Sequence, residues 1–167
     1  MVRYWVIAPY SYDPRHILDA VWDWSFTNGL ITIGWHELGN LSGVSKAVIR
    51  KRFLDEFDQE GYQSLQRFWH DIEVGDRVIA RGGLKRIVGV GTVAGKPEFD
   101  LELGKKVTGG LDDNIHPNFI KLNWLACQRQ FPNSAFRGHL KTVSELKNTQ
   151  KHWPEIRNAL REVWQME

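Results

Sequence analysis

Aromatic residues around one short stretch are the strongest indication of chemistry in this sequence. Trp22, Trp24 and Trp35 all lie within WDWSFTNGLITIGW. A planar base that stacks on an aromatic face gains about 1–3 kcal/mol, and a methyl group on that base adds roughly 0.8 kcal/mol of apolar contact. We expect Trp22 to be core, whereas Trp24 and Trp35 fit two interpretations equally well: core packing, or a flat surface for a flat ligand.

Basic residues form three short clusters in a chain whose net charge is only +2. Such clusters can follow a phosphate backbone without making the whole chain a polycation, and a solvated charged surface is the alternative interpretation. The candidates for phosphate contact are Lys46, Arg50, Arg81, Lys85, Arg86 and Arg129.

The sequence offers no recognisable arrangement for catalysis. The six histidines are scattered, and none pairs with another or with Cys127 at a metal-ligand spacing. The glycines after Arg81 do not form a Walker loop. We therefore expect no enzyme activity, no metal and no cofactor.

Cysteine content and hydropathy indicate the compartment. A single Cys127, between apolar neighbours, excludes an internal disulfide framework and fits a reducing cytoplasm, with the thiol inert in a strand. The sequence contains no apolar stretch of the length that spans a bilayer. We expect a cytoplasmic protein with no membrane partner.

The elements that position these residues alternate irregularly between strand and helix patterns. Strands are expected at 3–8, 30–35, 76–81, 86–93 and 119–126, and helices after Pro14 and at 44–57, 62–72 and 153–164. Asp13 is the expected N-cap of the first helix, and Thr142 with Glu145 resembles a capping box that starts another helix. Residues 96–118 are expected to form a long loop. This order predicts one α+β domain over 1–167, with a small, curved, barrel-like mixed sheet and flanking helices.

The hairpin expected at 76–93 turns at GGLK. Gly82 and Gly83 permit a tight tip that lifts Leu84 away from the sheet. Leu84 is then either a wedge that replaces an extruded base or a residue that folds back onto the long loop.

Several segments together resemble a known family. RYWVIAPYSYD, VWDWSFTNGLITIGWHELGNLS, VGDRVIARGGLKRIVGVGTVAG and FIKLNWLACQRQFP are similar to EVE domains of the PUA-like superfamily, which are relatives of YTH domains. The similarity extends from about residue 3 to residue 163, and it is greatest to the domains of modification-dependent restriction systems. It implies a strongly curved sheet with helices packed outside.

The resemblance implies roles for individual residues. Trp24 followed by Ser25 resembles the cage tryptophan of YTH domains and the serine whose carbonyl accepts from a methylamine. Tyr10, Ser11 and Asp13 occupy the place of residues that contact the base edge.

The chain also departs from the YTH pattern. The loop that carries a second cage aromatic in YTH domains has no tryptophan here and offers only Phe99. Trp35 is the expected substitute, and Arg129 lies where YTH domains carry a phosphate-binding arginine.

These observations support three hypotheses of different kinds. The leading one is a non-catalytic reader that flips a methylated adenine or cytosine of DNA into an aromatic cage. It would target a restriction system, with a nuclease or an NTPase as effector partner. The second is an RNA-binding PUA-like domain that reads modified RNA or assists RNA modification. The third is an enzyme whose catalytic residues are dispersed along the chain.

Overall fold

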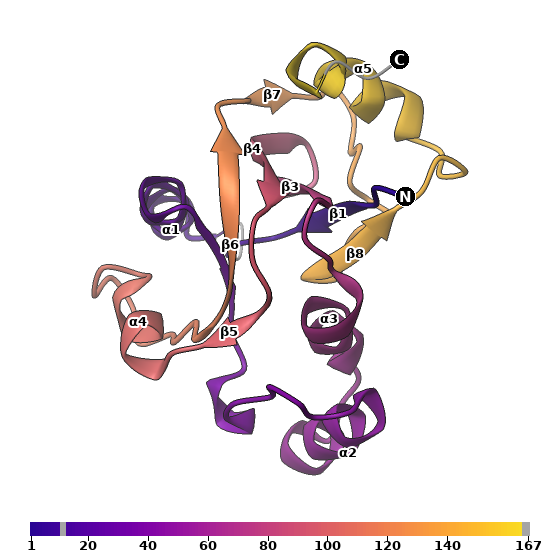
Figure 1. Cartoon of the computed structure of the whole chain (residues 1–167). Coiled ribbons are helices and arrows are strands. Elements are labelled where there is room, and N and C mark those ends of the chain that lie inside the picture. The colour runs from indigo at the N-terminus through magenta and orange to yellow at the C-terminus, as the bar shows by residue number, and fades with distance from the viewer. Residues whose placement is uncertain (11–12, 165–167) are drawn as a thin grey trace.

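A curved mixed sheet forms the centre of the computed structural model, which describes residues 1–10 and 13–164 (Figure 1). The strands are β1 (Tyr4–Ile7), β2 (Leu30–Ile33), β3 (Arg77–Gly82), β4 (Arg86–Val93), β5 (Glu98–Phe99), β6 (Asn118–Leu125), β7 (Arg129–Gln130) and β8 (Val143–Leu146). The helices are α1 (Arg15–Asn28), η1 (His36–Leu38), α2 (Lys46–Phe57), α3 (Tyr62–Gln66), η2 (Arg67–Asp71), α4 (Leu101–Lys106) and α5 (Trp153–Trp164).

The strand order brings distant parts of the chain together. The main path of the sheet is β2-β6-β4-β3-β1-β8, while β5 pairs with β6 and β7 pairs with β4. β1 and β3 are parallel, and the other pairs within the described residues are antiparallel. The ends of β1 and β2 and the start of β8 thereby lie around the same end of the sheet, where the candidate site is found.

Two apolar cores lie on opposite faces of the central strands. On β1, Trp5 and Ile7 belong to the core that includes Phe53 of α2, whereas Val6 belongs to the core that includes Ile156 of α5. This alternation follows from the two-residue period of a strand. Figure 1 shows α2 and α3 on one side of the sheet and α5 near the N-terminus.

The α+β fold class and most expected elements are confirmed. The hairpin at 76–93, the strand at 119–126 and the helix at 153–164 occur within one or two residues of the expected bounds. Trp22 is core, as expected, with 7% of its surface exposed. Cys127 is also buried, and this burial raises the pKa of its thiol, consistent with the expected inert thiol, although the residue lies between β6 and β7 rather than in a strand.

Two helix-start predictions were wrong. Pro14 occupies the N-cap position of α1 without a side-chain hydrogen bond, and exposed Asp13 does not cap the helix. The capping-box pattern at Thr142 and Glu145 precedes no helix, because residues 143–146 form β8 and pair with β1. Pairing with an otherwise open strand edge outweighs the local preference of four residues.

Two other expectations need correction. Residues 96–118 are not a continuous loop, because they include β5 and α4, the latter capped by the Asp100 side chain on the Leu103 amide at 3.0 Å. β2 ends at Ile33 rather than at Trp35. Trp35 therefore lies outside the sheet, in a segment that leads into η1.

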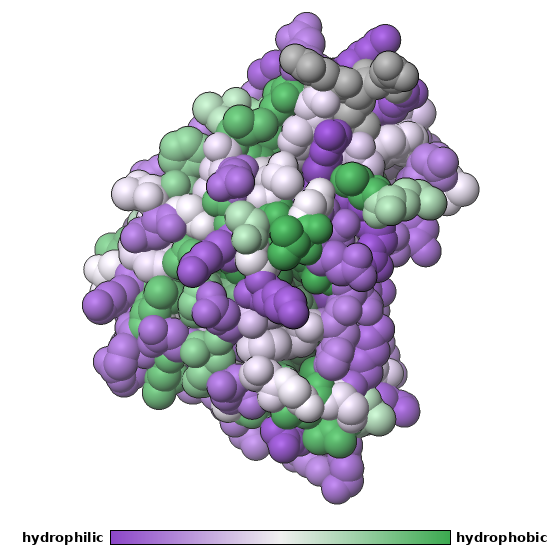
Figure 2. Space-filling model, in the orientation of Figure 1, coloured by the Kyte–Doolittle hydropathy of each residue, from purple (hydrophilic) through white to green (hydrophobic). Residues whose placement is uncertain are grey.

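The surface is mixed in character. Figure 2 shows hydrophobic residues in small groups separated by hydrophilic ones on the described part of this face. Among the residues that the structure describes, no helix has both the length and the apolarity needed to cross a membrane.

Candidate functional site

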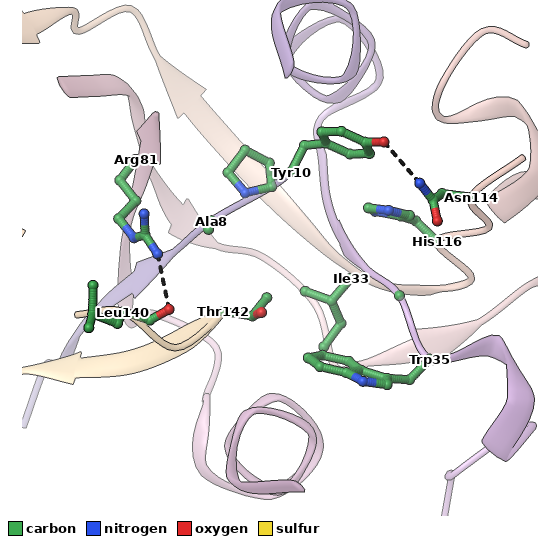
Figure 3. Close-up of a pocket in the computed structure, with 11 residues that line it drawn as sticks. Ala8, Tyr10, Ile33, Trp35, Arg81, Asn114, His116, Leu140 and Thr142 are labelled. Carbon is green, nitrogen blue, oxygen red and sulfur yellow. Dashed lines mark hydrogen bonds between the residues drawn. The ribbon is translucent and has the colours of Figure 1, made fainter. Parts of the chain in front are cut away.

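A cavity of about 410 Å³ opens where the ends of β1 and β2 approach β3 and the start of β8 (Figure 3). The residues around it come from segments that are far apart in the sequence. They are Ala8, Pro9, Tyr10, Ile33, Gly34, Trp35, Arg81, Asn114, His116, Leu140 and Thr142.

Trp35 forms one wall and is held there by its backbone and by the core below it. Its φ of 65° is in the left-handed region, which is uncommon for a bulky residue and often marks a functional site. The indole packs on Phe53 with ring centroids 6.0 Å apart. Just before it, the Gly34 carbonyl accepts a 2.7 Å hydrogen bond from the fully buried Asn118 amide. Asn118 in turn accepts from the Trp69 indole at 3.2 Å, so this position is braced from two helices and a strand.

Tyr10 and His116 form the opposite wall. Their rings are stacked, with centroids 5.7 Å apart and an interplanar angle of 19°. The Tyr10 hydroxyl donates to the Asp112 carboxylate and accepts from the Asn114 amide at 2.9 Å. Figure 3 shows this pair across the cavity from Trp35. Aromatic rings thus face the cavity from two sides.

His116 is neutral at physiological pH. Burial lowers its pKa to about 4, although the Asp112 carboxylate acts in the opposite direction. Its backbone amide donates to the Gly104 carbonyl at 3.1 Å, which docks α4 beneath it. A Cβ at Gly104 would lie 2.7 Å from Pro117, so only glycine allows this close approach. A neutral imidazole offers one donor and one acceptor.

Arg81 closes the far end of the cavity. Only 8% of its surface is exposed, yet within residues 1–10 and 13–164 it has no ion pair. Its Nη1 donates to the Gly83 carbonyl at 3.0 Å, its Nη2 reaches the Leu140 carbonyl at 3.4 Å, and its Nε has no partner. Burial lowers the pKa of this guanidinium. The register of β3 against β4 shifts between Ala80 and Arg81, an irregularity of the kind that re-aims a side chain.

The structure does not bring Trp24 and Ser25 into this cavity. The half-buried Trp24 ring packs with Ile17, Val21 and Val107 on the α1 side of the molecule. Ser25 is fully buried, and its carbonyl accepts from the Trp124 indole at 3.2 Å. The resemblance to YTH domains assigned this carbonyl to the methylamine of a modified base. In the structure it already accepts a hydrogen bond from an indole N–H.

Two other described members of the expected base pocket are also not among the cavity residues. Asp13 is exposed at the start of α1. Phe99 is half-buried on β5, where it pairs with Asn118. Ser11 lies outside the described residues. Tyr10 and Trp35 are the members of the expected set that do line the cavity.

Five of the six expected phosphate contacts do not line the cavity, and three of these five have partners elsewhere. Lys46 pairs with Asp71 at 2.5 Å, and Arg86 pairs with Asp19 at 3.2 Å. Arg50 lies over the Tyr62 ring at 5.3 Å. Lys85 is exposed at the hairpin tip, and Arg129 lines a separate hollow beside α1. Of the six expected phosphate contacts, Arg81 is the one that lines the cavity.

Leu84 is half-buried rather than projecting freely from the hairpin. Its carbonyl accepts from the Phe136 amide at 3.0 Å, and the Lys85 carbonyl accepts from the Phe131 amide at 2.7 Å. The 131–136 segment therefore hydrogen-bonds to the backbone of the hairpin tip.

Sequence reasoning missed His116, Asn114 and Asn118. They follow the Asp112–Asp113 pair in a segment with no recognisable motif, and only the fold brings them to Tyr10 and Gly34. Among the described residues, no three His, Cys, Asp or Glu side chains are grouped so that they can hold a metal ion.

Comparison with known proteins gives one family match. The model described as "Domain of unknown function (DUF8426)" matches residues 11–147. None of the curated proteins compared with the chain matches it. Among solved structures, the YTH domain of the Zygosaccharomyces rouxii MRB1 protein, in complex with N6-methyladenosine RNA, is 14% identical, with 98% of this chain and 86% of that chain covered and a TM-score of 0.47. Likeness at this level is too distant to transfer a site, and the resemblance to EVE domains stays a prediction.

Proposed function

This chain belongs to the family of the domain of unknown function DUF8426, and we propose that it binds single-stranded RNA without catalysis, holding one base between Trp35 and the Tyr10–His116 pair. The observation that carries this proposal is the convergence of aromatic rings on two sides of one cavity. Unstacked bases of single-stranded RNA are commonly held on aromatic side chains in this way.

The polar groups of the cavity suit the edge of an uncharged base. His116 is neutral and offers a donor and an acceptor, and the Asn114 amide lies beside Tyr10. A methylated base gains additional apolar contact in such a slot, about 0.8 kcal/mol for one methyl group. We therefore propose a preference for a methylated adenine or cytosine over the unmodified base.

Single-stranded RNA fits the structure better than the duplex DNA favoured by the sequence. A base in a duplex must first be extruded, which costs a few kcal/mol. The expected wedge, Leu84, is half-buried, and its backbone is hydrogen-bonded to the 131–136 segment. A single strand presents its bases without that cost and without a wedge. A role as the DNA-targeting module of a restriction system, with a nuclease or an NTPase as effector, is the alternative that the following experiment separates.

The test is a binding panel with short labelled oligonucleotides of one sequence. It compares unmodified RNA with RNA that carries one N6-methyladenine or one 5-methylcytosine, and each with single-stranded DNA and duplex DNA bearing the same base. We expect the tightest binding to a methylated single-stranded RNA and at least tenfold weaker binding to the matching duplex.

Two outcomes would contradict the proposal. Binding that is equal for all oligonucleotides would remove the base-specific role of the cavity. Tighter binding to duplex DNA with a methylated base than to any single strand would restore the DNA-reader interpretation.

A further inference from the structure

We infer that Arg81 forms an anion subsite in this cavity and binds the phosphate group of the nucleotide whose base lies at Trp35. The identity of the base partner rests on the proposed function, whereas the anion subsite rests on Arg81 itself. The ligand of the cavity is then a nucleotide unit, and a free base or a nucleoside would fill only part of it.

The first reason is the missing counter-charge. A buried charge is costly unless it is paired, and Arg81 has no carboxylate at ion-pair distance in the described part of the chain. The Gly83 and Leu140 carbonyls supply partial negative charge but do not neutralise a guanidinium. An anionic ligand would neutralise the guanidinium.

The second reason is unused hydrogen-bonding capacity. The guanidinium has five N–H donors in a fixed fork that matches phosphate and carboxylate oxygens. Within the described residues the buried Nε has no partner, and the 3.4 Å contact of Nη2 is long for a hydrogen bond. Buried donors without a partner are uncommon in folded proteins, and this one shows that the protein itself does not use the full hydrogen-bonding capacity of the guanidinium.

The third reason is the position of Arg81 within the cavity. Figure 3 places its side chain beside Leu140, at the other end of the cavity from Trp35 and Tyr10, with Thr142 between them. The volume of about 410 Å³ lies within the range of about 300–1,000 Å³ that is typical of ligand pockets. One ligand can therefore place a ring at the aromatic end and an anion at Arg81, with the Thr142 hydroxyl as a further polar group.

The surrounding charges favour an anion over a cation. His139 is buried near Arg81, and burial lowers its pKa, with the Arg81 charge acting in the same direction and a hydrogen bond with Gln150 in the opposite one; its Nδ1 is 2.6 Å from the Ser144 hydroxyl. An imidazole carries no negative charge in either protonation state, so His139 does not compete with an anion for Arg81.

The test measures nucleoside and nucleotide affinity separately by calorimetry. The ligands are N6-methyladenosine, its 5′-monophosphate, its 3′-monophosphate and inorganic phosphate. The proteins are the native chain, Arg81→Met and the matched control Arg52→Met, which removes one positive charge from an exposed position on α2. The two monophosphates distinguish a 5′-phosphate from a 3′-phosphate as the group that reaches Arg81.

We expect one of the two monophosphates to bind the native chain and Arg52→Met at least tenfold more tightly than the nucleoside. In Arg81→Met that preference should fall to twofold or less, while the affinity for the nucleoside stays within twofold of the native value. Arg81→Lys, which keeps the charge but loses the fork, should retain an intermediate preference.

Folding and function can be separated. Because Arg81 has no counter-charge within the described residues, Arg81→Met should melt at the same temperature as the native chain or higher, and phosphate should stabilise the native chain and Arg52→Met but not Arg81→Met. If Arg81→Met does not fold, Arg81→Lys and the phosphate titration of the native chain decide the result. Equal affinity of the native chain for nucleoside and both nucleotides, or a preference that survives in Arg81→Met, would overturn the subsite. Stabilisation by phosphate that requires Arg81, without any nucleoside binding, would support the subsite and refute the proposed base pocket.

Discussion

Trp24 and Trp35 lie eleven positions apart in one stretch of sequence, and their surroundings in the structure differ in kind. Trp24 packs with Val21 and Val107, and its own carbonyl accepts from the Asn28 amide at 2.8 Å. Trp35 faces a cavity that is also lined by a guanidinium with no carboxylate partner among the described residues, and a left-handed backbone holds Trp35 there.

This contrast indicates that an aromatic residue marks a binding site only when the groups around it line a cavity with it. Around Trp24, the Ser25 carbonyl is already used by Trp124. Around Trp35, aromatic rings, a neutral imidazole and the Arg81 guanidinium line one cavity. We therefore assign the ligand to the Trp35 side and packing to the Trp24 side.

The largest expected effect comes from removing the amides that support each tryptophan. Asn118→Ala leaves the Gly34 carbonyl and the Trp69 indole without partners, and it should lower the free energy of unfolding by about 2–4 kcal/mol. Asn28→Ala removes an exposed amide that donates to the Trp24 carbonyl, and it should change stability by about 0.5 kcal/mol or less. Urea denaturation of both variants measures this. If both variants lost a similar free energy of unfolding, the hydrogen bonds around Trp35 would be no more important for stability than the one at the exposed end of α1.

The next effect concerns affinity. Trp35→Ala should weaken binding of the preferred RNA by about 1–3 kcal/mol, the value of one stacked base, which is roughly 5- to 150-fold. Trp24→Ala should change affinity less than twofold, because its ring does not line the cavity. Fluorescence anisotropy with circular dichroism as a folding control measures both. If Trp24→Ala lost more RNA affinity than Trp35→Ala while its circular dichroism stayed native, the base would instead bind beside α1.

The smallest effect is a pH dependence specific to the cavity. The pKa of His116 is lowered to about 4, below its value in the unfolded chain, so the unfolded state binds more protons as pH falls from about 6.5 towards 4. Stability is therefore lost on acidification through this range. His139 contributes with the same sign. His116→Gln should lose less stability than the native chain between pH 7 and pH 4.5, and equal losses would show that His116 is not buried as a neutral group.

Local sequence patterns predicted the parts of the fold in which local and tertiary preferences agree. The hairpin and α5 are examples, since Ile156 and Leu160 have helical spacing and both are fully buried. The 142–145 pattern failed because β8 completes the sheet beside β1, a contact between residues more than 130 positions apart. Pairing partners of this kind are not encoded in a short window.

The candidate site was predictable only in part. Tyr10 and Trp35 were expected from the resemblance and from strand patterning, and both line the cavity. Arg81 was expected as a surface contact, but it is buried and its guanidinium reaches the carbonyl of Leu140, 59 positions along the chain. His116 stacks on Tyr10 only because the segment after α4 folds back towards β1, and no sequence motif predicts this contact.

The most direct test of where the base binds records which indole responds to a nucleotide. The chain has eight tryptophans, and their indole N–H resonances can be assigned from single Trp→Phe variants and followed by NMR during titration with N6-methyladenosine monophosphates. We predict that the Trp35 signal shifts to saturation while the Trp24 signal stays unchanged. A shift of the Trp24 signal with an unchanged Trp35 signal would contradict the assignment of the base to this cavity.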